Sequence, residues 1–480
     1  MTFEDVAWPE DGRVLISPSF ASEPKEGVYP IVAGLGDQTA RRFALTIGRA
    51  GSKYLGLKAD AGVLSLVVST TPVPEDNIWT GGAAGPWDGL NWDFGQLFGA
   101  GGNAVFRTAG AQVTVPTTGI AVNDLVFDAS ATLVGNGRVD IAGAVSVAAD
   151  QTARIETPYA CASLQKDGAG RLELPTLPET FSIHHARGSL VLNGAPDQTS
   201  TLGLPDGQVG EDLILHGPGT FLTTRLYPYP NTSQWTIDGG AEVFPTTSSS
   251  SGGTDGLMVG QNPVINLGAC TLGSGYSDTR DVAVGRCIYL NLTDAETGFT
   301  VRTENAAGEP VTFYWHSVGS WFNDPFETRG TGRLNVGGTG TLVFNGDPTT
   351  PTPAKLKHTG GTVFQSGVTV KFQQPVELGA VTVEPNASLV FEMLSGTENT
   401  AALKASAITW PETGTIPFKV FGSTALADGE YVLATGVGDI PVSRFAADLF
   451  ILGKTLTLTN PAIDTKHFIS PLPSVPRSAP

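Results

Sequence analysis

Charged residues are scarce in this chain, and the two signs are out of balance. Only 15% of the 480 residues are Asp, Glu, Lys or Arg, and the formal net charge is −18. Nucleic acids and anionic membrane surfaces are bound largely through Lys and Arg. We therefore expect no nucleic-acid partner. The acidic residues are scattered singly, which is typical of a solvated surface.

Cysteine is also rare, with Cys161, Cys270 and Cys287 the only three. Three cysteines cannot all pair and are too few for a disulfide scaffold. The spacing leaves two alternatives open, a single Cys270–Cys287 bridge between neighbouring turns or buried thiols throughout. No C-x-x-C or Cys/His spacing suggests zinc, so we expect no metal and no cofactor.

Long apolar runs and helical periodicity are absent as well. No stretch approaches 18 apolar residues, so no transmembrane helix is expected, and residues 1–8 lack the features of a signal peptide. With 60 Gly and 33 Pro, the composition argues against a helical protein. A chain of this length exceeds one compact core, which favours several domains or an all-β solenoid.

The feature present in abundance is a short strand introduced by a Gly-x-Gly turn. In residues 329–346, Leu334 and Val336 alternate with Arg333 and Asn335, which predicts a half-buried strand. The same phrase recurs, at irregular spacing, at residues 135–141, 168–174 and 217–222. A strand-and-turn unit repeated over hundreds of residues predicts a β-solenoid, in which each unit stacks on the next.

The beginning and end of the chain repeat one another. Residues 8–44 match residues 410–446 at a constant offset of 402, with twelve identical positions. The sequence predicts that both copies close with an alternating strand, at residues 62–68 and 453–459. Two interpretations remain open: similar caps at both ends of a solenoid, which must block their exposed ends, or a module of about 400 residues repeated head to tail. We favour the repeated module, because generic capping does not require a gapless match.

These observations predict five segments. They are a β-rich N-terminal element (1–72), a linker (73–78), a β-helix (79–408) with an irregular insertion (about 226–330), a β-rich C-terminal element (409–460) and a Pro-rich extended tail (461–480).

Motifs at the start of the predicted helix carry a family resemblance. W-T-G-G at 79–82, W-D-x-x-N-W at 87–92 and V-N-D-L-V-F at 122–127 precede the Gly-x-Gly phrases. Together they resemble bacterial autotransporter-associated β-strand repeat proteins of the Verrucomicrobia, Lentisphaerae and Planctomycetes, over residues 79–460. The resemblance implies a right-handed parallel β-helix at the cell surface or secreted. These motifs are structural and imply no reaction.

Trp79, Trp87 and Trp92 within those motifs have two interpretations. They are either a carbohydrate-binding platform or a plug that covers the open first rung of the helix, and we favour the plug.

The segment 226–330 holds the candidates for binding and catalysis, since loops projecting from a solenoid usually carry function. The aromatic candidates for glycan binding are Tyr227, Tyr229, Trp235, Trp315 and Trp321. The weak catalytic candidates are Asp278, Asp281 and His316. A glycoside hydrolase needs two closely spaced carboxyl groups, and Asp278 and Asp281 fit an ordinary polar turn better.

We therefore expect an exported structural or adhesive solenoid, extracellular or at the cell surface, rather than an enzyme. Without a signal peptide of its own, the chain would be a piece of a longer exported polypeptide. Matched surfaces at its two ends favour end-to-end self-association into a filament or tandem array. The residues predicted to take part are Trp8, Tyr29, Trp410 and Tyr431. The alternatives are a polysaccharide lyase or glycoside hydrolase, and a module that binds surface glycans.

Overall fold

The structure is a computed structural model, and it forms two compact units that are described separately. Unit 1 contains residues 1–178 and 184–191, and unit 2 contains residues 179–183 and 192–480. The structure describes residues 13–36, 40–47, 49–71, 73–93, 97–99, 101–203, 212–223, 234–246, 255–259, 264–276, 282–286, 288–315, 327–344, 355–393, 400–422, 426, 431–451, 456–459 and 466–471.

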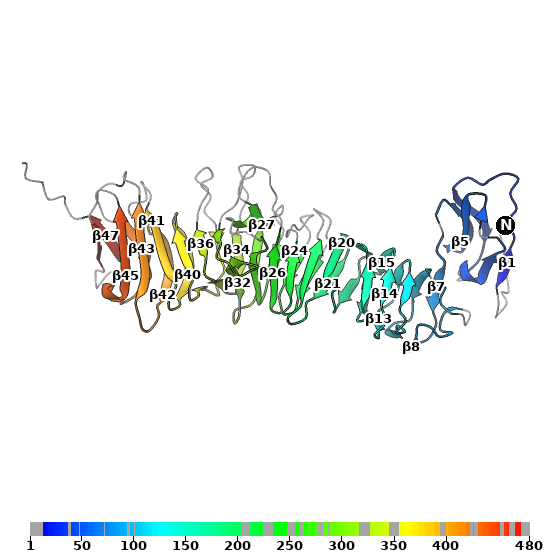
Figure 1. The fold of residues 1–480 in the computed structure, drawn as a ribbon, viewed down its shortest axis with the longest axis horizontal. Coiled ribbons are helices and arrows are strands. Elements are labelled where there is room, and N and C mark those ends of the chain that lie inside the picture. The colour runs from blue at the N-terminus through cyan, green and yellow to red at the C-terminus, as the bar shows by residue number, and fades with distance from the viewer. Residues whose placement is uncertain are drawn as a thin grey trace, which may run out of the picture. The chain divides into compact units, whose positions relative to one another are not determined.

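Unit 1 begins with the N-terminal element, which has its own small apolar core (Figure 1, dark blue). Two of its strands pair in parallel, β1 (Val14–Ile16) and β3 (Phe43–Leu45), and a 3₁₀ turn, η1 (Ala40–Arg42), precedes β3. The others form an antiparallel sheet in the order β2 (Gly27–Ala33), β6 (Val63–Ser69), β5 (Lys53–Asp60) and β4 (Arg49–Ala50).

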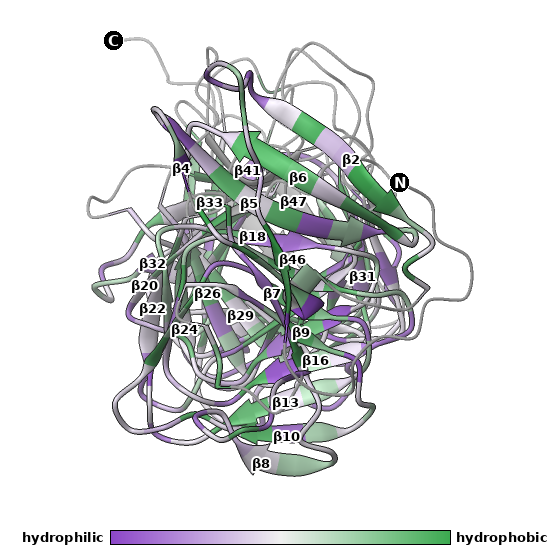
Figure 2. Cartoon of the chain, turned by 90° about the vertical axis from the view of Figure 1, so that its right-hand side faces the viewer, coloured by the Kyte–Doolittle hydropathy of each residue, from purple (hydrophilic) through white to green (hydrophobic). Residues whose placement is uncertain are grey.

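The rest of unit 1 is a parallel β-helix built from three stacks of short strands, one of which is visible as β8, β10, β13 and β16 in Figure 2. The first stack is β7 (Asp76–Trp79), β9 (Asn103–Phe106), β12 (Leu125–Phe127), β15 (Ala144–Val147) and β18 (Leu164–Asp167). The second is β8 (Ala84–Pro86), β10 (Ala111–Thr114), β13 (Ala131–Val134), β16 (Thr152–Ile155) and β19 (Arg171–Leu174). The third is β11 (Ile120–Val122), β14 (Val139–Ile141) and β17 (Tyr159–Cys161).

Unit 2 is also a parallel β-helix of three stacks. The first is β22 (Thr199–Gly203), β24 (Thr220–Thr223), β26 (Ala241–Pro245), β29 (Cys270–Ser274), β32 (Phe299–Asn305), β35 (Leu334–Gly337), β38 (Thr362–Phe364), β40 (Val376–Val383), β42 (Leu403–Thr409) and β44 (Tyr431–Thr435). The second is β23 (Asp212–His216), β25 (Gln234–Ile237), β28 (Val264–Leu267), β31 (Tyr289–Leu292), β34 (Glu327–Gly330) and β37 (Lys355–Leu356).

The third stack of unit 2 is β27 (Asp255–Val259), β30 (Val282–Arg286), β33 (Thr312–Tyr314), β36 (Thr341–Phe344), β39 (Thr369–Phe372), β41 (Ser388–Met393), β43 (Ile416–Gly422) and β45 (Phe445–Ile451). A 3₁₀ turn, η3 (Val442–Arg444), precedes β45, and the hairpin of β46 (Leu456–Thr459) and β47 (Lys466–Pro471) follows it. The strands β20 (Thr180–Ala186) and β21 (Ser189–Asn193) contain residues of both units.

The glycine-turn phrases form the rungs as the sequence predicts. In β35, Leu334 and Val336 are fully buried in the core. Gly330 adopts a φ of 90°, and a Cβ there would lie 2.2 Å from the carbonyl oxygen of Leu292, so the turn requires glycine. Asn335, on the opposite face, is also buried, so β35 is covered on both faces and not half-buried as predicted; the Asn335 amide is satisfied by donating to the Thr297 carbonyl at 2.7 Å. The expected all-β parallel β-helix is confirmed.

The tryptophans at the start of the helix form a plug rather than a platform. Trp79, Trp87 and Trp92 are all buried. The ring centroids of Trp79 and Trp92 lie 5.4 Å apart, and those of Trp87 and Trp92 lie 4.8 Å apart. The Trp92 indole donates to the Trp87 carbonyl at 2.8 Å. No ring face is free to stack on a sugar, so the plug interpretation is the correct one.

Three predicted boundaries need correction. The first strand of the helix, β7, begins at Asp76, so residues 76–78 belong to the first rung and not to a linker. Strands β25 to β34 continue the stacks through residues 226–330, so this segment is not one irregular insertion. Residues 466–471 form β47, where the sequence predicted a Pro-rich extended tail; β47 pairs with both β44 and β46.

Candidate functional site

Seven of the predicted site residues fall at positions that the structure does not describe. Asp278, Asp281, His316, Tyr227, Tyr229, Trp321 and Trp8 lie outside the described residues. Their proposed roles in catalysis, glycan binding or assembly therefore stay predictions.

Two of the aromatic candidates are wrong as glycan ligands. Trp235 and Trp315 are each only 1% exposed, so both rings belong to the core of the helix. A sugar is bound by stacking on an exposed ring face, which neither residue offers. The period-two pattern of β25 indicated this for Trp235, since the polar residues Gln234 and Thr236 alternate with it along the strand.

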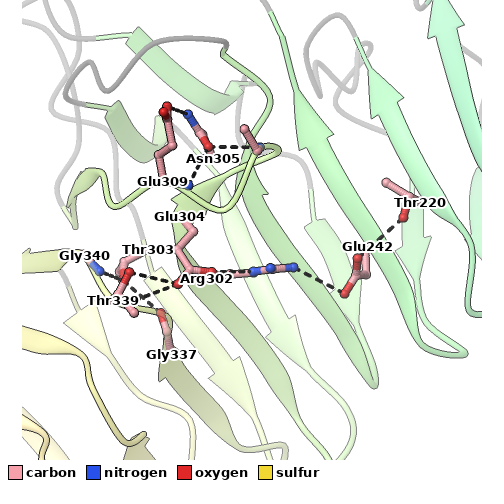
Figure 3. Close-up of polar contacts among 11 residues, drawn as sticks. Thr220, Glu242, Arg302, Thr303, Glu304, Asn305, Glu309, Gly337, Thr339 and Gly340 are labelled. Carbon is pink, nitrogen blue, oxygen red and sulfur yellow. Dashed lines mark hydrogen bonds and ion pairs between the residues drawn. The ribbon is translucent and has the colours of Figure 1, made fainter.

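Two carboxylates in this part of unit 2, those of Glu242 and Glu304, are ion-paired with Arg302. Figure 3 shows Arg302 between Glu242 and Glu304, with N···O distances of 3.7 and 3.0 Å. The backbone and hydroxyl of Thr339 each donate to Glu304 at 3.0 Å. Burial works against ionisation of Glu304, but the hydrogen bonds from Arg302 and Thr339 outweigh it and lower the pKa. An ionised, paired carboxylate is a poor proton donor, so this group is not suited to the acid role in glycoside hydrolysis.

The part of the chain that the structure describes contains no group of three or more His, Cys, Asp or Glu residues able to hold a metal ion. Burial raises the pKa of the Cys161 thiol to about 11 and raises that of the Cys270 thiol further. Cys270 is a free thiol, in place of the bridge to Cys287 that the spacing allowed, and Cys287 lies outside the described residues. Both thiols are therefore poor nucleophiles.

A groove of about 840 Å³ lies beside the end of the second stack, lined by Leu356, His358, Val376, Glu377 and Lys404 among others. Lys404 and Glu377 form an ion pair at 3.0 Å. His358 is buried between the hydroxyls of Thr328 and Thr362, and burial lowers its pKa to about 4. The described lining holds no Trp, Tyr or Phe, so the groove lacks the stacking face of a typical sugar site.

The terminal elements form the clearest candidate site, because the sequence repeat is also a structural repeat. In the N-terminal element β1 pairs with β3 through Val14↔Phe43 and Ile16↔Leu45. In unit 2, β43 pairs with β45 through Ile416↔Phe445. Adding 402 to Val14 and Phe43 gives Ile416 and Phe445, so the two copies share the same strands in the same register.

The turn before the second strand of each pair is also repeated. Gly34 and Gly36 have φ angles of 87° and 57°, and their counterparts Gly436 and Gly438 have φ angles of 74° and 71°. These left-handed conformations favour glycine, which explains its presence at both positions in both copies. In each copy a 3₁₀ turn follows, Ala40–Arg42 and Val442–Arg444.

The strand order of each element corresponds as well. The sequence paired residues 62–68 with 453–459, but the structure assigns 456–459 (β46) to the place of β5 and β47 to the place of β6. Tyr29 of β2 pairs with Leu66 of β6, and Tyr431 of β44 pairs with Ile469 of β47. The order is β2-β6-β5 in one copy and β44-β47-β46 in the other.

In the C-terminal element, the W-P-E-x-G phrase at 410–414 and the R-F-A phrase at 444–446 form an internal clasp. The Arg444 guanidinium donates to the carbonyl oxygens of Gly414 at 2.8 Å and Pro411 at 2.6 Å. The Trp410 indole donates to the Val437 carbonyl at 2.9 Å, and its ring packs edge-on against Phe445. In this copy, both phrases therefore stabilise the fold of the element.

One of the four predicted assembly residues is buried: Tyr431 is 4% exposed, so its side chain is not available to a partner in this structure. Trp410 is partly exposed, although its indole is held in the clasp of the C-terminal element. Tyr29 differs from Tyr431, because it is 41% exposed.

The two copies differ on one side, which we call the near side. In unit 2, β43 pairs with β41 and β44 pairs with β42. Among the described residues of the N-terminal element, β1 pairs with β3 alone and β2 with β6 alone, so the corresponding edges have no partner strand. Leu15 on β1 and Val28 on β2 are 70% and 59% exposed. The sequence does not reveal this difference, since pairing partners lie far apart along the chain.

Within the described residues, the structure contains no helix long and apolar enough to cross a membrane. A scan of the chain against protein-family models finds no match, and searches of curated proteins and of solved structures find none either. Inferences about function therefore rest on the fold and the internal repeat.

Proposed function

We propose that this protein is an exported structural or adhesive β-solenoid whose terminal elements associate end to end, in a filament or a tandem array. The observation that carries the proposal is the near side of the N-terminal element. It has two strand edges without a described partner and exposes Leu15, Val28 and Tyr29. Unpaired strand edges are templates for pairing with another chain, and natural proteins usually cover or blunt them.

The repeat gives this association a direction. A surface near the start of one copy that fits a different surface near the end of another copy makes a head-to-tail contact. Such contacts form open chains when the rotation between copies does not close a ring. Extended, repetitive assemblies of this kind suit a structural role outside the cell. Three features support the extracellular location: the low fraction of charged residues, the glycine-rich rungs and the resemblance to autotransporter-associated repeat proteins.

An enzymatic role receives less support. The carboxylates around Arg302 are ion-paired, and the catalytic candidates of the sequence lie outside the described residues. A glycan-binding role loses Trp235 and Trp315, which are buried.

Static light scattering over a concentration series, with samples equilibrated for days, tests the proposal. We expect the molar mass to rise with concentration. The substitution Tyr29→Lys should suppress this rise, because it adds a charge to the exposed edge. Leu90→Lys is the matched control, since Leu90 is also exposed, at 68%, but lies in the β-helix of unit 1. A constant monomer mass for the unchanged chain at every concentration would refute the proposal.

A further inference from the structure

The far side of each terminal element, opposite its near side, is closed by a hairpin. In unit 2, β44 pairs with β42 along one edge and with β47 along the other, and β46 pairs with β47. In the N-terminal element, β6 takes the corresponding edge of β2, and β5 pairs with β6.

This hairpin prevents simple stacking of one copy on another. The strands β43 and β44 belong to the same turn of the helix, and β1 and β2 correspond to them. If β1 of a second copy paired with the outer edge of β45, its β2 would lie one row beyond the strand that pairs with β44, and so would need the outer edge of β47. That edge already carries β46. The N-terminal element therefore does not fit on an intact C-terminal element.

The C-terminal copy shows what the near side does fit. There, β43 pairs with β41 through five residues, from Leu389↔Phe418 to Met393↔Gly422. The neighbouring strand β44 pairs with β42 through Leu403↔Ala434. The near side of the C-terminal element is thus bound to the turn of the helix that contains β41 and β42, which we call the β41–β42 turn.

We propose that the N-terminal element of one copy binds the β41–β42 turn of a second copy, in place of that copy's own C-terminal element. This inference rests on the proposed function and gives its mechanism. The partner is a second copy of this chain, because its β41–β42 turn already binds an element with the same register and strand order. Exchange of an equivalent element between copies is a known route to assembly.

The shared register specifies the new strand pairs. Phe418 pairs with Leu389, so its counterpart Ile16 would pair with Leu389 of the second copy. Ala434 pairs with Leu403, so its counterpart Val32 would pair with Leu403. The centroids of Phe391 and Phe418 lie 5.0 Å apart, and Ile16 would fill that position with a smaller apolar side chain.

The edge of β2 is compatible with this partner. In the C-terminal copy, the Val432 carbonyl accepts a hydrogen bond from the Ala402 amide at 3.3 Å. Its counterpart is Pro30, which keeps the carbonyl acceptor but has no N–H to donate. Proline on an edge strand hinders unspecific pairing, since it removes one donor from the row. The edge thus retains the acceptor that the β41–β42 turn uses.

The C-terminal element acts in this scheme as a latch on the β41–β42 turn. Exchange requires β43 and β44 to leave β41 and β42 first, so association should be slow and should increase when the latch is weakened. Arg444→Ala weakens it without touching the β41–β42 turn, because it removes the clasp on Pro411 and Gly414. We expect this variant to associate at least several-fold faster than the unchanged chain.

Disulfide trapping between two full-length versions of the chain tests the register. Both versions carry Ala in place of Cys161, Cys270 and Cys287, and circular dichroism checks that they remain folded. One carries Leu15→Cys and the other Ser388→Cys. The register places Leu15 opposite Ser388, one pair before Ile16 and Leu389, within the separation that a disulfide spans. The control partner carries Val390→Cys, two residues along the same strand and beyond that separation.

We expect the 15/388 mixture to give a covalent heterodimer in higher yield than the 15/390 mixture. Adding Arg444→Ala should increase that yield. A third mixture pairs Leu15→Cys with Ala446→Cys in β45. A heterodimer there, or association by light scattering without a 15/388 product, would overturn the exchange while leaving end-to-end association standing. Absence of association altogether would overturn both, so the two failures are distinguishable.

Discussion

Tyr29 and Tyr431 occupy the same position in two copies of one structural element, yet Tyr29 is 41% exposed and Tyr431 is 4% exposed. Each pairs with an apolar residue of an antiparallel strand, Leu66 and Ile469 respectively. The difference arises because β44 is covered by β42 whereas β2 lacks a corresponding described partner. The exposure of Tyr29 thus reflects the absence, among the described residues, of a strand paired with β2 in the way that β42 pairs with β44.

The two tyrosines should respond differently to substitution by Asp. Tyr431→Asp places a charge in a packed region and should lower the free energy of unfolding by about 3 kcal/mol or more. Tyr29→Asp changes an exposed residue and should alter it by no more than about 0.5 kcal/mol. Urea unfolding followed by circular dichroism measures both. Equal losses would show that the near side is covered in solution.

The tryptophan plug should be a major source of stability at the start of the helix. Trp92→Ala removes a fully buried ring and should cost about 3–5 kcal/mol. Leu90→Ala, two residues away and exposed, should cost little. Limited proteolysis and urea unfolding of both variants check this. A Trp92→Ala chain as stable as the unchanged protein would contradict the packing described for the three indoles.

Lys166 is a buried lysine whose ammonium group is satisfied by backbone carbonyls. It is 0% exposed, and its Nζ donates to the carbonyl oxygens of Asp167, Gly168 and Arg187 at 3.2, 2.9 and 2.6 Å. Lys166→Met keeps most of the volume but leaves these buried acceptors without a charged donor, which should cost about 2–4 kcal/mol. Urea unfolding measures the loss, and Lys58→Met, at an exposed lysine, is the control. A neutral Lys166→Met result would mean that water replaces the ammonium.

His358 should make stability depend on pH. Burial lowers its pKa from 6.5 to about 4, so the folded state favours the neutral ring. Between pH 6.5 and 4 the unfolded chain binds the proton more readily than the folded chain. The free energy of unfolding therefore has its full value above pH 6.5 and decreases as the pH falls toward 4. The whole effect amounts to about 3 kcal/mol at most.

His358→Gln tests that assignment. It should flatten the stability profile between pH 6.5 and 4. Thermal unfolding at closely spaced pH values provides the measurement. A slope retained in His358→Gln would assign the dependence to other groups.

Local patterns in the sequence predict the rungs of the helix but not how distant segments pair. Alternation around Leu334 and the glycine at 330 are local features, and both forecast the observed strand and turn. The plug could also be recognised, because three tryptophans cluster between residues 79 and 92. The same alternation could have shown that Trp235 is buried, although its place in an aromatic-rich segment suggested binding.

The hairpin β46–β47 shows why the rest could not be predicted. The constant offset of 402 changes by one residue after the repeated R-F-A phrase, so that Lys53-x-Leu55-x-Leu57 corresponds to Lys454-x-Leu456-x-Leu458. A one-residue change in register moves every side chain to the other face of a strand. Nothing local indicates that Lys466–Pro471 pairs with β44, since that contact joins strands more than 30 residues apart.

Electron microscopy of the purified chain over a concentration series, after long equilibration, tests the central claim most directly. The account predicts linear assemblies at high concentration, with a regular axial repeat that corresponds to one copy, and more of them for Arg444→Ala. Isolated particles at every concentration, for both the unchanged chain and Arg444→Ala, would contradict end-to-end association through the terminal elements.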